Sequence, residues 1–140
     1  MTAHFLVEPY NPHRRDARQT GVMIVVVCPG QGSQTPGFLS PWLAESRFAD
    51  HLQMLSDASG LDLAAHGTTS DADTIRNTAV AQPLIVAAGL LALSVLLEGR
   101  REKIGGVAGH SVGEVTAAAA AGILSETDAM TLVRERGTAM

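Results

Sequence analysis

The feature that most constrains the fold is the run MIVVVC at residues 23–28, which ends at Pro29 and Gly30. Its β-branched residues favour extended backbone, and the absence of polar alternation predicts a strand buried on both faces of a parallel sheet. A second strand is predicted over residues 104–108, IGGVA, with helical segments before and after it. Strands that alternate with helices predict an α/β fold in which helices flank a parallel sheet.

Helical segments are expected between the two strands. Ser40 and Pro41 have the pattern of an N-cap and a first helical position. An amphipathic helix follows over residues 47–59 and ends at Gly60, and a short helix is expected over residues 71–77. The apolar face of the amphipathic helix comprises Phe48, Leu52 and Leu55.

An apolar stretch of 19 residues, 79–97, is long enough to raise the question of a membrane span. Gln82 and Pro83 interrupt its start and leave 14 residues, 84–97, which is the length of a buried core helix. Small and polar residues within this part also lower its hydrophobicity. We therefore expect a core helix here and no membrane span.

Two more helices are expected after the second strand. An alanine-rich helix is predicted over residues 112–121, with a stop at Gly122. Ser125 and Asp128 have the spacing of a capping box, in which a serine side chain binds the backbone N–H three residues later. A last helix is therefore predicted to begin there and to run to residue 140.

Charge and cysteine content exclude several classes of function. Ten Lys and Arg residues stand against 14 Asp and Glu residues, and the one basic cluster is Arg14, Arg15 and Arg18, so we expect no nucleic-acid partner. Cys28 is the single cysteine and cannot form an internal disulfide, and no Cys/His spacing resembles a zinc site. No metal is therefore expected, and a reducing cytoplasm is the expected location.

The first 22 residues differ in character from the rest of the chain. They contain two prolines, charges of both signs and no hydrophobic period, which predicts a flexible N-terminal extension over residues 1–22. They also lack the apolar stretch of about 7 to 15 residues that a secretory signal requires. Regular structure is expected from Met23, so residues 23–140 form the folded part.

The motif Gly109-His110-Ser111-Val112-Gly113 reads G-x-S-x-G and lies between a predicted strand and a predicted helix. This is the context of a nucleophile elbow, a strained turn that exposes a serine and in which flanking glycines relieve crowding. The hydroxyl would lie at a helix N-terminus, where free N–H groups stabilise an oxyanion. The alternative is a glycine-rich turn in which Ser111 is only the helix N-cap.

A second glycine-rich motif, PGQGSQ at residues 29–34, directly follows the first strand. It matches neither a dinucleotide fingerprint nor a P-loop, because Phe38 stands where a P-loop requires lysine. The backbone N–H of Gln31 would lie at the carboxyl end of a parallel strand, where α/β sheets bind ligands. The alternative is a tight turn with solvated glutamines.

Helical geometry places Arg136 in the middle of the apolar face of the last helix, whereas Arg134 and Glu135 fall on the other sides as surface charges. The other members of this face are Ala129, Leu132, Val133 and Met140. A guanidinium on an apolar face requires an anionic partner, because burial of an unpaired charge is costly. That partner is either a carboxylate of the protein or a substrate carboxylate bound by two hydrogen bonds.

These three motifs resemble those of the malonyl-CoA:acyl carrier protein transacylase family and of the related acyltransferase domains of polyketide synthases. In that family PGQGSQ follows the first strand, GHS(V/L)GE holds the nucleophilic serine, and an Arg-Gly pair follows. The corresponding elements here are residues 29–34, GHSVGE at 109–114 and Arg136-Gly137. The resemblance runs from Met23 to residue 140. It implies the first part of an α/β-hydrolase-like large subdomain, with the remainder and a ferredoxin-like small subdomain absent from these residues.

By this resemblance Ser111 is the nucleophile, the backbone N–H groups of Gln31 and Val112 form an oxyanion hole, and Arg136 binds the malonyl carboxylate. The implied reaction transfers a malonyl group from malonyl-CoA, through a malonyl-serine ester, to the phosphopantetheine thiol of acyl carrier protein. It belongs to fatty acid or polyketide biosynthesis. No cofactor is implied, because the phosphopantetheine is carried by the partner protein.

Two further residues are assigned to the substrate-binding site, Gln82 because it matches a family glutamine near the pocket, and His110 because it neighbours the serine. The family base is a histidine far downstream of the serine, beyond residue 140, and no histidine of this chain is expected to replace it. Cys28 is expected to be a small apolar residue without a role in the site. The histidines expected to be exposed or incidental are His4, His13, His51 and His66.

Two other functions are compatible with the same residues. A serine hydrolase or esterase also uses a G-x-S-x-G elbow. A non-catalytic remnant that binds CoA or a carrier protein would explain why the histidine is missing. For the transacylase, the expected partners are malonyl-CoA, acyl carrier protein and a C-terminal half, and we expect the chain by itself to be weak or inactive.

Overall fold

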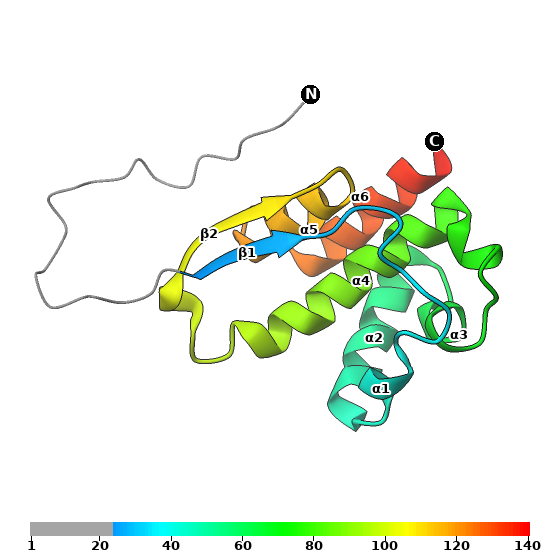
Figure 1. The fold of residues 1–140 in the computed structure, drawn as a ribbon, viewed down its shortest axis with the longest axis horizontal. Helices are drawn as coiled ribbons and strands as arrows, with labels where there is room; N and C mark the ends of the chain where they lie inside the picture. The colour runs from blue at the N-terminus through cyan, green and yellow to red at the C-terminus, as the bar shows by residue number, and fades with distance from the viewer. Residues whose placement is uncertain (1–23) are drawn as a thin grey trace, which may run out of the picture.

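The computed structural model describes residues 24–140, so the extension predicted over residues 1–22 lies outside the described residues. Helices follow each of the two strands along this part of the chain (Figure 1), as expected for the predicted α/β fold. In chain order the elements are β1 Ile24–Cys28, α1 Ser40–Leu43, α2 Ser46–Ser59, α3 Leu63–Thr68, η2 Thr74–Arg76, α4 Thr78–Leu96, η3 Arg101–Lys103, β2 Ile104–Gly109, α5 Gly113–Ala120 and α6 Glu126–Thr138.

The two strands form a parallel sheet, which confirms the predicted pairing. Val25 pairs with Gly106 and Cys28 with Gly109, and the register shifts between Ile24 and Val25. Parallel strands end at the same edge of a sheet. The turns that follow Cys28 and Gly109 therefore lie side by side, and the two glycine-rich motifs are neighbours in space.

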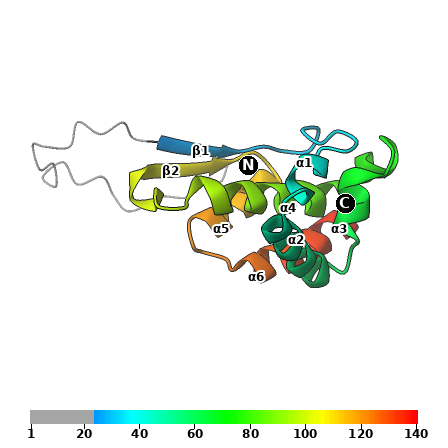
Figure 2. The ribbon, with the colours of Figure 1, turned by 90° about the horizontal axis from the view of Figure 1, so that it is seen from below.

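The long helices cover one face of this sheet. Figure 2 shows β1 and β2 edge-on, with α4, α5 and α6 on one side of them. On the other face Val25 is 55% and Val27 is 71% exposed, whereas Val26 packs against the core. The prediction that the first strand is buried on both faces was wrong, because no layer of residues 24–140 covers the second face.

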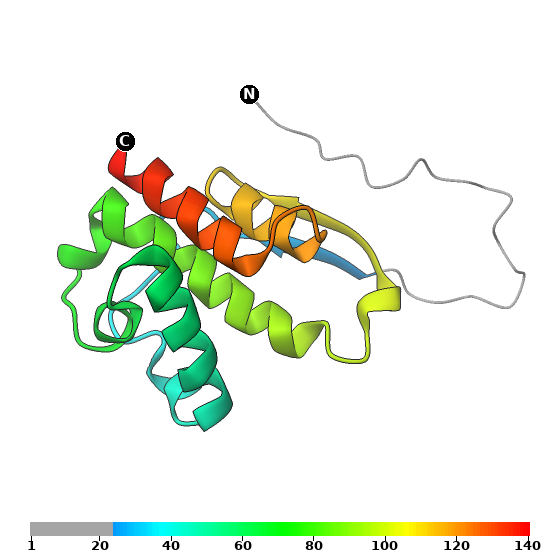
Figure 3. The same ribbon diagram turned by 180° about the vertical axis from the view of Figure 1, so that it is seen from behind.

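The central helix of the core is α4, which packs against α2, α3, α5 and α6 (Figure 3). It continues through Pro83, so the expectation that Gln82 and Pro83 interrupt this stretch was wrong. A proline inside a helix removes the hydrogen bond to the carbonyl four residues earlier, here that of Ala79, and the rest of the helix keeps its bonds. The side chain of Asn77 caps the helix by accepting a hydrogen bond from Ala79 N at 3.0 Å.

The prediction of a core helix in the apolar stretch is confirmed. Within the described part of the chain, α4 is the one helix that could cross a membrane by length and composition alone. Its most apolar window is 56% buried inside the fold, and the core helix of a globular protein has the same character. The packing of α4 against four helices explains why so many consecutive residues are apolar.

The amphipathic helix is confirmed as α2, whose residues Phe48, Leu52 and Leu55 are buried. It ends at Gly60, whose φ of 68° lies in the left-handed region that favours glycine. Ser40 is the first residue of the one-turn helix α1 and not its N-cap, because Leu39 occupies that position.

Two segments between α2 and α4 differ from the predictions. Helix α3 was not predicted, although its N-cap Asp62 accepts a hydrogen bond from Ala65 N at 2.9 Å, and aspartate at this position is a recognisable signal. The short helix predicted over residues 71–77 is a single 3₁₀ turn, η2. Its first residue is held by Asp71, whose carboxylate accepts a hydrogen bond from Thr74 N at 2.8 Å.

The last two helices agree with the predictions within one or two residues. Gly122, after α5, has a φ of 75°, and Ser125 caps α6 through the predicted bond from Asp128 N, at 3.0 Å. The Asp128 carboxylate accepts a 2.6 Å hydrogen bond from the Ser125 hydroxyl. This half of the capping box differs from the standard pattern, in which the carboxylate binds the N-cap backbone N–H.

Candidate active site

Ser111 lies on the sharp turn between β2 and α5. Its φ of 55° makes it the one non-glycine residue with positive φ in the described part of the chain. A Cβ atom on Gly109 would collide with the backbone of Gly113 and Glu114, and one on Gly113 would collide with the backbone carbonyls of Cys28 and Pro29. The glycines of G-x-S-x-G are therefore required by close backbone approach on both sides of the serine.

The hydroxyl of Ser111 does not cap the following helix. The N-cap of α5 is Val112, and no side chain caps it. Ser111 lies one residue before this position, and its hydroxyl accepts no hydrogen bond from a backbone N–H of α5. The alternative in which Ser111 is only an N-cap was therefore wrong. Its Oγ instead accepts a hydrogen bond from Nη2 of Arg136 at 3.1 Å.

Arg136 is half-buried at the border of the core-facing side of α6, not in its middle. The buried residues of α6 are Ala129, Met130, Val133 and Gly137. Leu132 and Met140, predicted to share the apolar face with Arg136, are 47% and 76% exposed. The predicted face was therefore wrong, because Gly137 packs directly against α4, where a Cβ would lie 2.9 Å from the carbonyl oxygen of Thr78.

The guanidinium of Arg136 has uncharged partners. Nη1 donates to Oε1 of Gln82 and Nη2 donates to Oγ of Ser111. No carboxylate of residues 24–140 forms an ion pair with it, so the first alternative, a carboxylate of the protein, is not observed in this part of the chain. The positive charge of Arg136 beside Ser111 is therefore not neutralised by a carboxylate of residues 24–140. An arginine without an anionic partner is available to pair with an anionic ligand.

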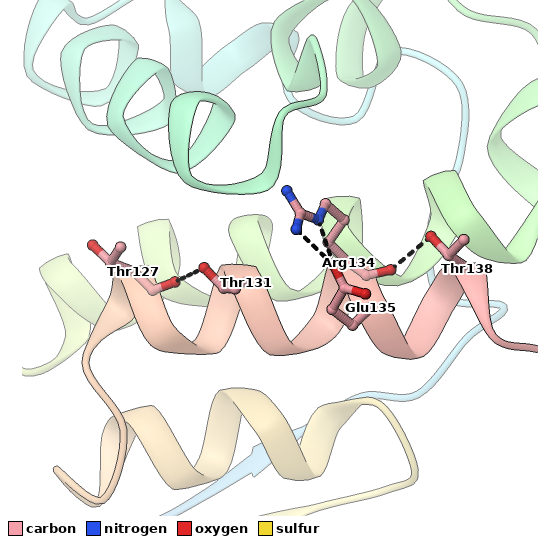
Figure 4. Close-up of polar contacts among 5 residues, drawn as sticks. All are labelled: Thr127, Thr131, Arg134, Glu135 and Thr138. Atoms are coloured by element: carbon pink, nitrogen blue, oxygen red, sulfur yellow. Dashed lines mark hydrogen bonds and ion pairs between the residues drawn. The ribbon is translucent and has the colours of Figure 1, made fainter.

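The neighbouring Arg134 provides a contrast on the same helix (Figure 4). Its Nε and Nη2 donate to Oε1 of Glu135 at 3.1 and 2.6 Å, so its charge is paired. The two residues lie away from the buried face of α6, as predicted, whereas their pairing was not predicted. The threonines on this side of α6 bind only the helix backbone: Thr131 donates to Thr127 O, and Thr138 donates to Arg134 O, each at 2.9 Å. The polar side chains labelled on this side of α6 thus find their hydrogen-bond partners within the helix itself.

Gln82 is almost fully buried in α4 and binds the guanidinium of Arg136. Its Oε1 accepts the hydrogen bond from Arg136, and its Nε2 donates to Sδ of Met140 at 3.4 Å. Because the acceptor and donor atoms of the amide are both engaged, its orientation is determined. The structure thus brings Gln82 of α4, Arg136 of α6 and Ser111 of the turn after β2 together.

The turn after β1 is tied to the segment before α4 by its second glutamine. Oε1 of Gln34 accepts a hydrogen bond from Gly32 N, and its Nε2 donates to Ile75 O, both at 2.9 Å. The side chain is half-buried. Gln34 therefore connects the glycine turn to η2, and the alternative of a turn with solvated glutamines was wrong for this residue.

The first glutamine of the turn makes weaker contacts. Nε2 of Gln31 donates to Arg76 O at 3.3 Å and to Oγ1 of Thr78 at 3.5 Å, and the residue is exposed. The backbone N–H groups of Gln31 and Val112 donate to no acceptor among residues 24–140, so both are free to bind a ligand. Their role in an oxyanion hole stays a prediction.

His110 joins the two glycine-rich motifs. Its backbone N donates to Cys28 O at 3.1 Å, and a Cβ on Gly30 would lie 2.6 Å from Nδ1 of its ring. The exposed imidazole thus lies against the turn after β1. Cys28 is buried as predicted, and burial raises the pKa of its thiol, which keeps the sulfur protonated and unreactive.

The other described histidines are remote from Ser111. His51 is 18% exposed, and its Nε2 lies 2.6 Å from Oε2 of Glu126, so of the expectation that it is exposed or incidental the first part does not hold. His66 is half-buried, with Nδ1 3.1 Å from Oγ of Ser70. His4 and His13 lie outside the described residues. Within residues 24–140, no histidine or carboxylate is hydrogen-bonded to Ser111.

A cavity of about 530 Å³ lies away from this site, between α2, the second half of α4 and α5. His51 and Glu126 line it together with Arg47, Glu98 and Arg101. Cations and anions are balanced in this lining, so it has no electrostatic preference for a ligand of either sign. Neither Ser111 nor Arg136 contributes to it.

A strained serine between a parallel strand and a helix, beside backbone N–H groups that are free, is the geometry of the α/β enzymes with a nucleophile elbow. Residues 25–140 match the family described as the acyl transferase domain, and the chain belongs to this family. The predicted resemblance is thereby confirmed.

Curated relatives and solved structures specify the branch of this family. The chain is 52% identical over 122 residues to the malonyl CoA-acyl carrier protein transacylase of Mycobacterium tuberculosis H37Rv, and 35% identical over 119 residues to that of Escherichia coli K12. These matches cover 84% and 81% of this chain, but 40% and 37% of the relatives. The chain thus spans about two fifths of the length of the curated relatives it matches.

The solved structures agree with the sequence relatives. The crystal structure of the Mycobacterium tuberculosis transacylase matches with a TM-score of 0.79 at 50% identity, over 85% of this chain and 40% of that one. A malonyl-transacylase in complex with a type II polyketide synthase acyl-carrier protein matches with a TM-score of 0.76 at 31% identity, over 84% and 38%. The predicted α/β acyltransferase fold is confirmed.

Proposed function

We propose that this chain provides the nucleophile and the carboxylate-binding residues of a malonyl-CoA:acyl carrier protein transacylase. The observation that supports this most directly is the contact between Ser111 and Arg136, whose charge has no carboxylate partner among residues 24–140. A malonyl thioester has both groups that such a site binds, a carbonyl for the serine and a free carboxylate for the guanidinium.

The proposed reaction has two acyl-transfer steps. The Oγ of Ser111 forms a bond to the malonyl carbonyl carbon, the thioester C–S bond breaks, and the serine proton ends on the thiol of CoA. The phosphopantetheine thiol of acyl carrier protein then attacks the malonyl-serine ester, the C–O bond breaks, and the proton returns to Ser111. The free N–H groups of Gln31 and Val112 would stabilise the oxyanion in both steps.

Proton transfer in this mechanism needs a base, which we assign to a segment downstream of residue 140, as the family resemblance implies. The uncovered sheet face that contains Val25 and Val27 supports such a segment, because parallel sheets are normally covered on both faces. We place the activity in the cytoplasm, in fatty acid or polyketide biosynthesis.

The direct test is transfer of radiolabelled malonyl from malonyl-CoA to the purified chain, with Ser111→Ala as the control. We expect slow, serine-dependent labelling by the chain alone, because removal of a triad base lowers the rate by several orders of magnitude. Labelling should accelerate when the downstream part of the Mycobacterium tuberculosis transacylase is added. No label in either mixture would contradict the proposal.

The choice of acyl group separates a transacylase from a serine esterase. With malonyl and acetyl thioesters in the same labelling assay, Arg136→Ala should abolish the preference for malonyl by raising the acetyl-to-malonyl rate ratio at least tenfold, which corresponds to about 1.4 kcal/mol. Arg134→Ala is the matched control, since its guanidinium is paired with Glu135. An unchanged ratio in Arg136→Ala would favour the esterase.

A further inference from the structure

The peptide unit between Gly30 and Gln31 is held by the side chain of Ser33. The Oγ of Ser33 donates a hydrogen bond to the backbone carbonyl of Gly30 at 3.0 Å. This carbonyl and the N–H of Gln31 belong to one peptide unit, which is trans and planar. In a trans peptide the C=O and N–H bonds point in opposite directions. Because the carbonyl points toward Ser33, the N–H of Gln31 points away from it.

Without the Ser33 bond this peptide unit would have little to hold it. Among residues 24–140, no backbone hydrogen bond engages the C=O of Gly30 or the N–H of Gln31. Glycines also lie on both sides of Gln31, and Gly32 has a φ of 108°, in a region that other residues rarely adopt. A flip of the unit would direct a carbonyl oxygen where the N–H now points. A carbonyl oxygen in that place would repel an oxyanion.

The next peptide unit of the turn is held by a second side chain. The N–H of Gly32 donates to Oε1 of Gln34 at 2.9 Å, and Nε2 of Gln34 donates to Ile75 O outside the turn. Gln31 thus lies between two peptide units that side chains orient. Ser33 determines the first of these units, which carries the N–H of Gln31, and Gln34 determines the second.

We propose that Ser33 is a positioning residue for acyl transfer, whose hydroxyl directs the N–H of Gln31 toward the oxyanion that forms at Ser111. This inference rests on the proposed function. The turn after β1 lies against the nucleophile elbow, since a Cβ on Gly30 would lie 2.9 Å from the carbonyl oxygen of His110. The Ser33 bond also polarises the peptide unit, and an N–H is a stronger donor when the carbonyl of its own unit accepts a hydrogen bond.

NMR relaxation of the Gln31 amide in the purified chain tests the positioning without any need for turnover. In the wild-type chain we expect an order parameter of about 0.85, as in rigid backbone, without exchange on the μs–ms timescale. In Ser33→Ala the order parameter should fall below about 0.6 or μs–ms exchange should appear. Ser33→Thr keeps the hydroxyl and should restore the wild-type behaviour, because residue 33 is exposed and the added methyl group has room.

The rate of malonyl labelling of Ser111 tests the consequence for the reaction. Removal of one oxyanion-hole donor lowers the rate by about 10²–10³-fold, and a mobile donor retains part of its effect, so Ser33→Ala should lower the saturating rate at least about tenfold. The malonyl-CoA concentration that gives half of this rate should not change, because an oxyanion forms only in the transition state. Ser33→Thr should restore the rate.

Ser94→Ala is the matched control for both measurements. Ser94 lies in α4, and its hydroxyl donates to the carbonyl three residues earlier, that of Leu91, at 2.7 Å, as Ser33 does in the turn. The variant should leave the Gln31 amide and the labelling rate unchanged.

The outcomes separate this inference from the proposed function. Labelling that depends on Ser111 but is equally fast in Ser33→Ala would overturn the inference and leave the transacylase proposal in place. A slower rate in Ser33→Ala with an unchanged Gln31 amide would also overturn it, because the effect would not pass through that N–H. Absence of Ser111-dependent label in every variant, the wild-type chain included, would contradict the proposed function and this inference with it.

Discussion

At the scale of single residues, the site depends on a strained backbone that its neighbours stabilise. Ser111 has a φ of 55°, and a non-glycine residue in this region costs of order 1–3 kcal/mol. The strain persists because the flanking turn is packed against the end of β1, with Gly113 against the carbonyl groups of Cys28 and Pro29. The same packing exposes the hydroxyl and prevents it from capping α5.

Gly113→Ala should therefore destabilise the protein by about 1–3 kcal/mol, because its Cβ would overlap backbone atoms that cannot move aside easily. Gly106→Ala in β2 is the matched control: its Cβ would meet nothing within 4 Å, so a change of no more than about 0.5 kcal/mol is expected. The free energy of unfolding in urea measures both. Equal losses in the two variants would contradict the packing argument.

At the scale of elements, residues 75–78 connect the parts of the site. The side chains of Gln34 and Gln31 donate to the carbonyl groups of Ile75 and Arg76, and Gly137 of α6 packs on the carbonyl group of Thr78. The turn after β1, the start of α4 and the end of α6 are thus held by one short segment. This segment sets the position of the free N–H of Gln31 relative to Arg136.

The variant Gln34→Glu tests this connection. The carboxylate still accepts a hydrogen bond from Gly32 N but cannot donate to Ile75 O, so the free energy of unfolding should fall by about 1–2 kcal/mol. The control Gln31→Glu changes an exposed side chain with longer contacts and should cost less than about 0.5 kcal/mol. If Gln31→Glu lowered the free energy of unfolding as much as Gln34→Glu does, the connection between the turn and residues 75–78 would not depend on Gln34.

At the scale of the whole molecule, helices cover one face of the sheet and the other face is bare (Figure 2). Val25 and Val27 lie on the bare face, and β-branched apolar side chains at such exposure are typical of a surface that another segment covers. The matched relatives are about two and a half times as long as the aligned part, which covers 40% of the Mycobacterium tuberculosis protein.

The double variant Val25→Thr/Val27→Thr should weaken association with the downstream part of the Mycobacterium tuberculosis transacylase by at least tenfold. Threonine keeps the branched shape that favours a strand, but its hydroxyl groups would be desolvated at the contact. Met54→Gln, on the exposed side of α2, should have no effect. Affinities from isothermal titration provide the comparison, and unchanged binding in the double variant would place the contact elsewhere.

Local patterns were sufficient to predict most elements. The β-branched run, the amphipathic spacing of α2, Gly60 and the Ser125 cap are each determined within a few residues of sequence, and the structure contains all of them. Predictions were wrong where packing decides: the second face of β1, the continuation of α4 through Pro83, and the rotation of α6 by which Met130 and Gly137, and not Leu132 and Met140, are buried.

The sequence by itself determined the strand-turn-helix context of Ser111 and the resemblance to acyltransferases, because these depend on short-range steric requirements of glycine and of β-branched residues. Only the tertiary structure decided that the partners of Arg136 are Gln82 and Ser111 and that the glutamines of the first turn bind residues 75–78. Contacts between residues up to 54 positions apart depend on how helices pack, and no local pattern encodes the rotation and approach of one helix against another.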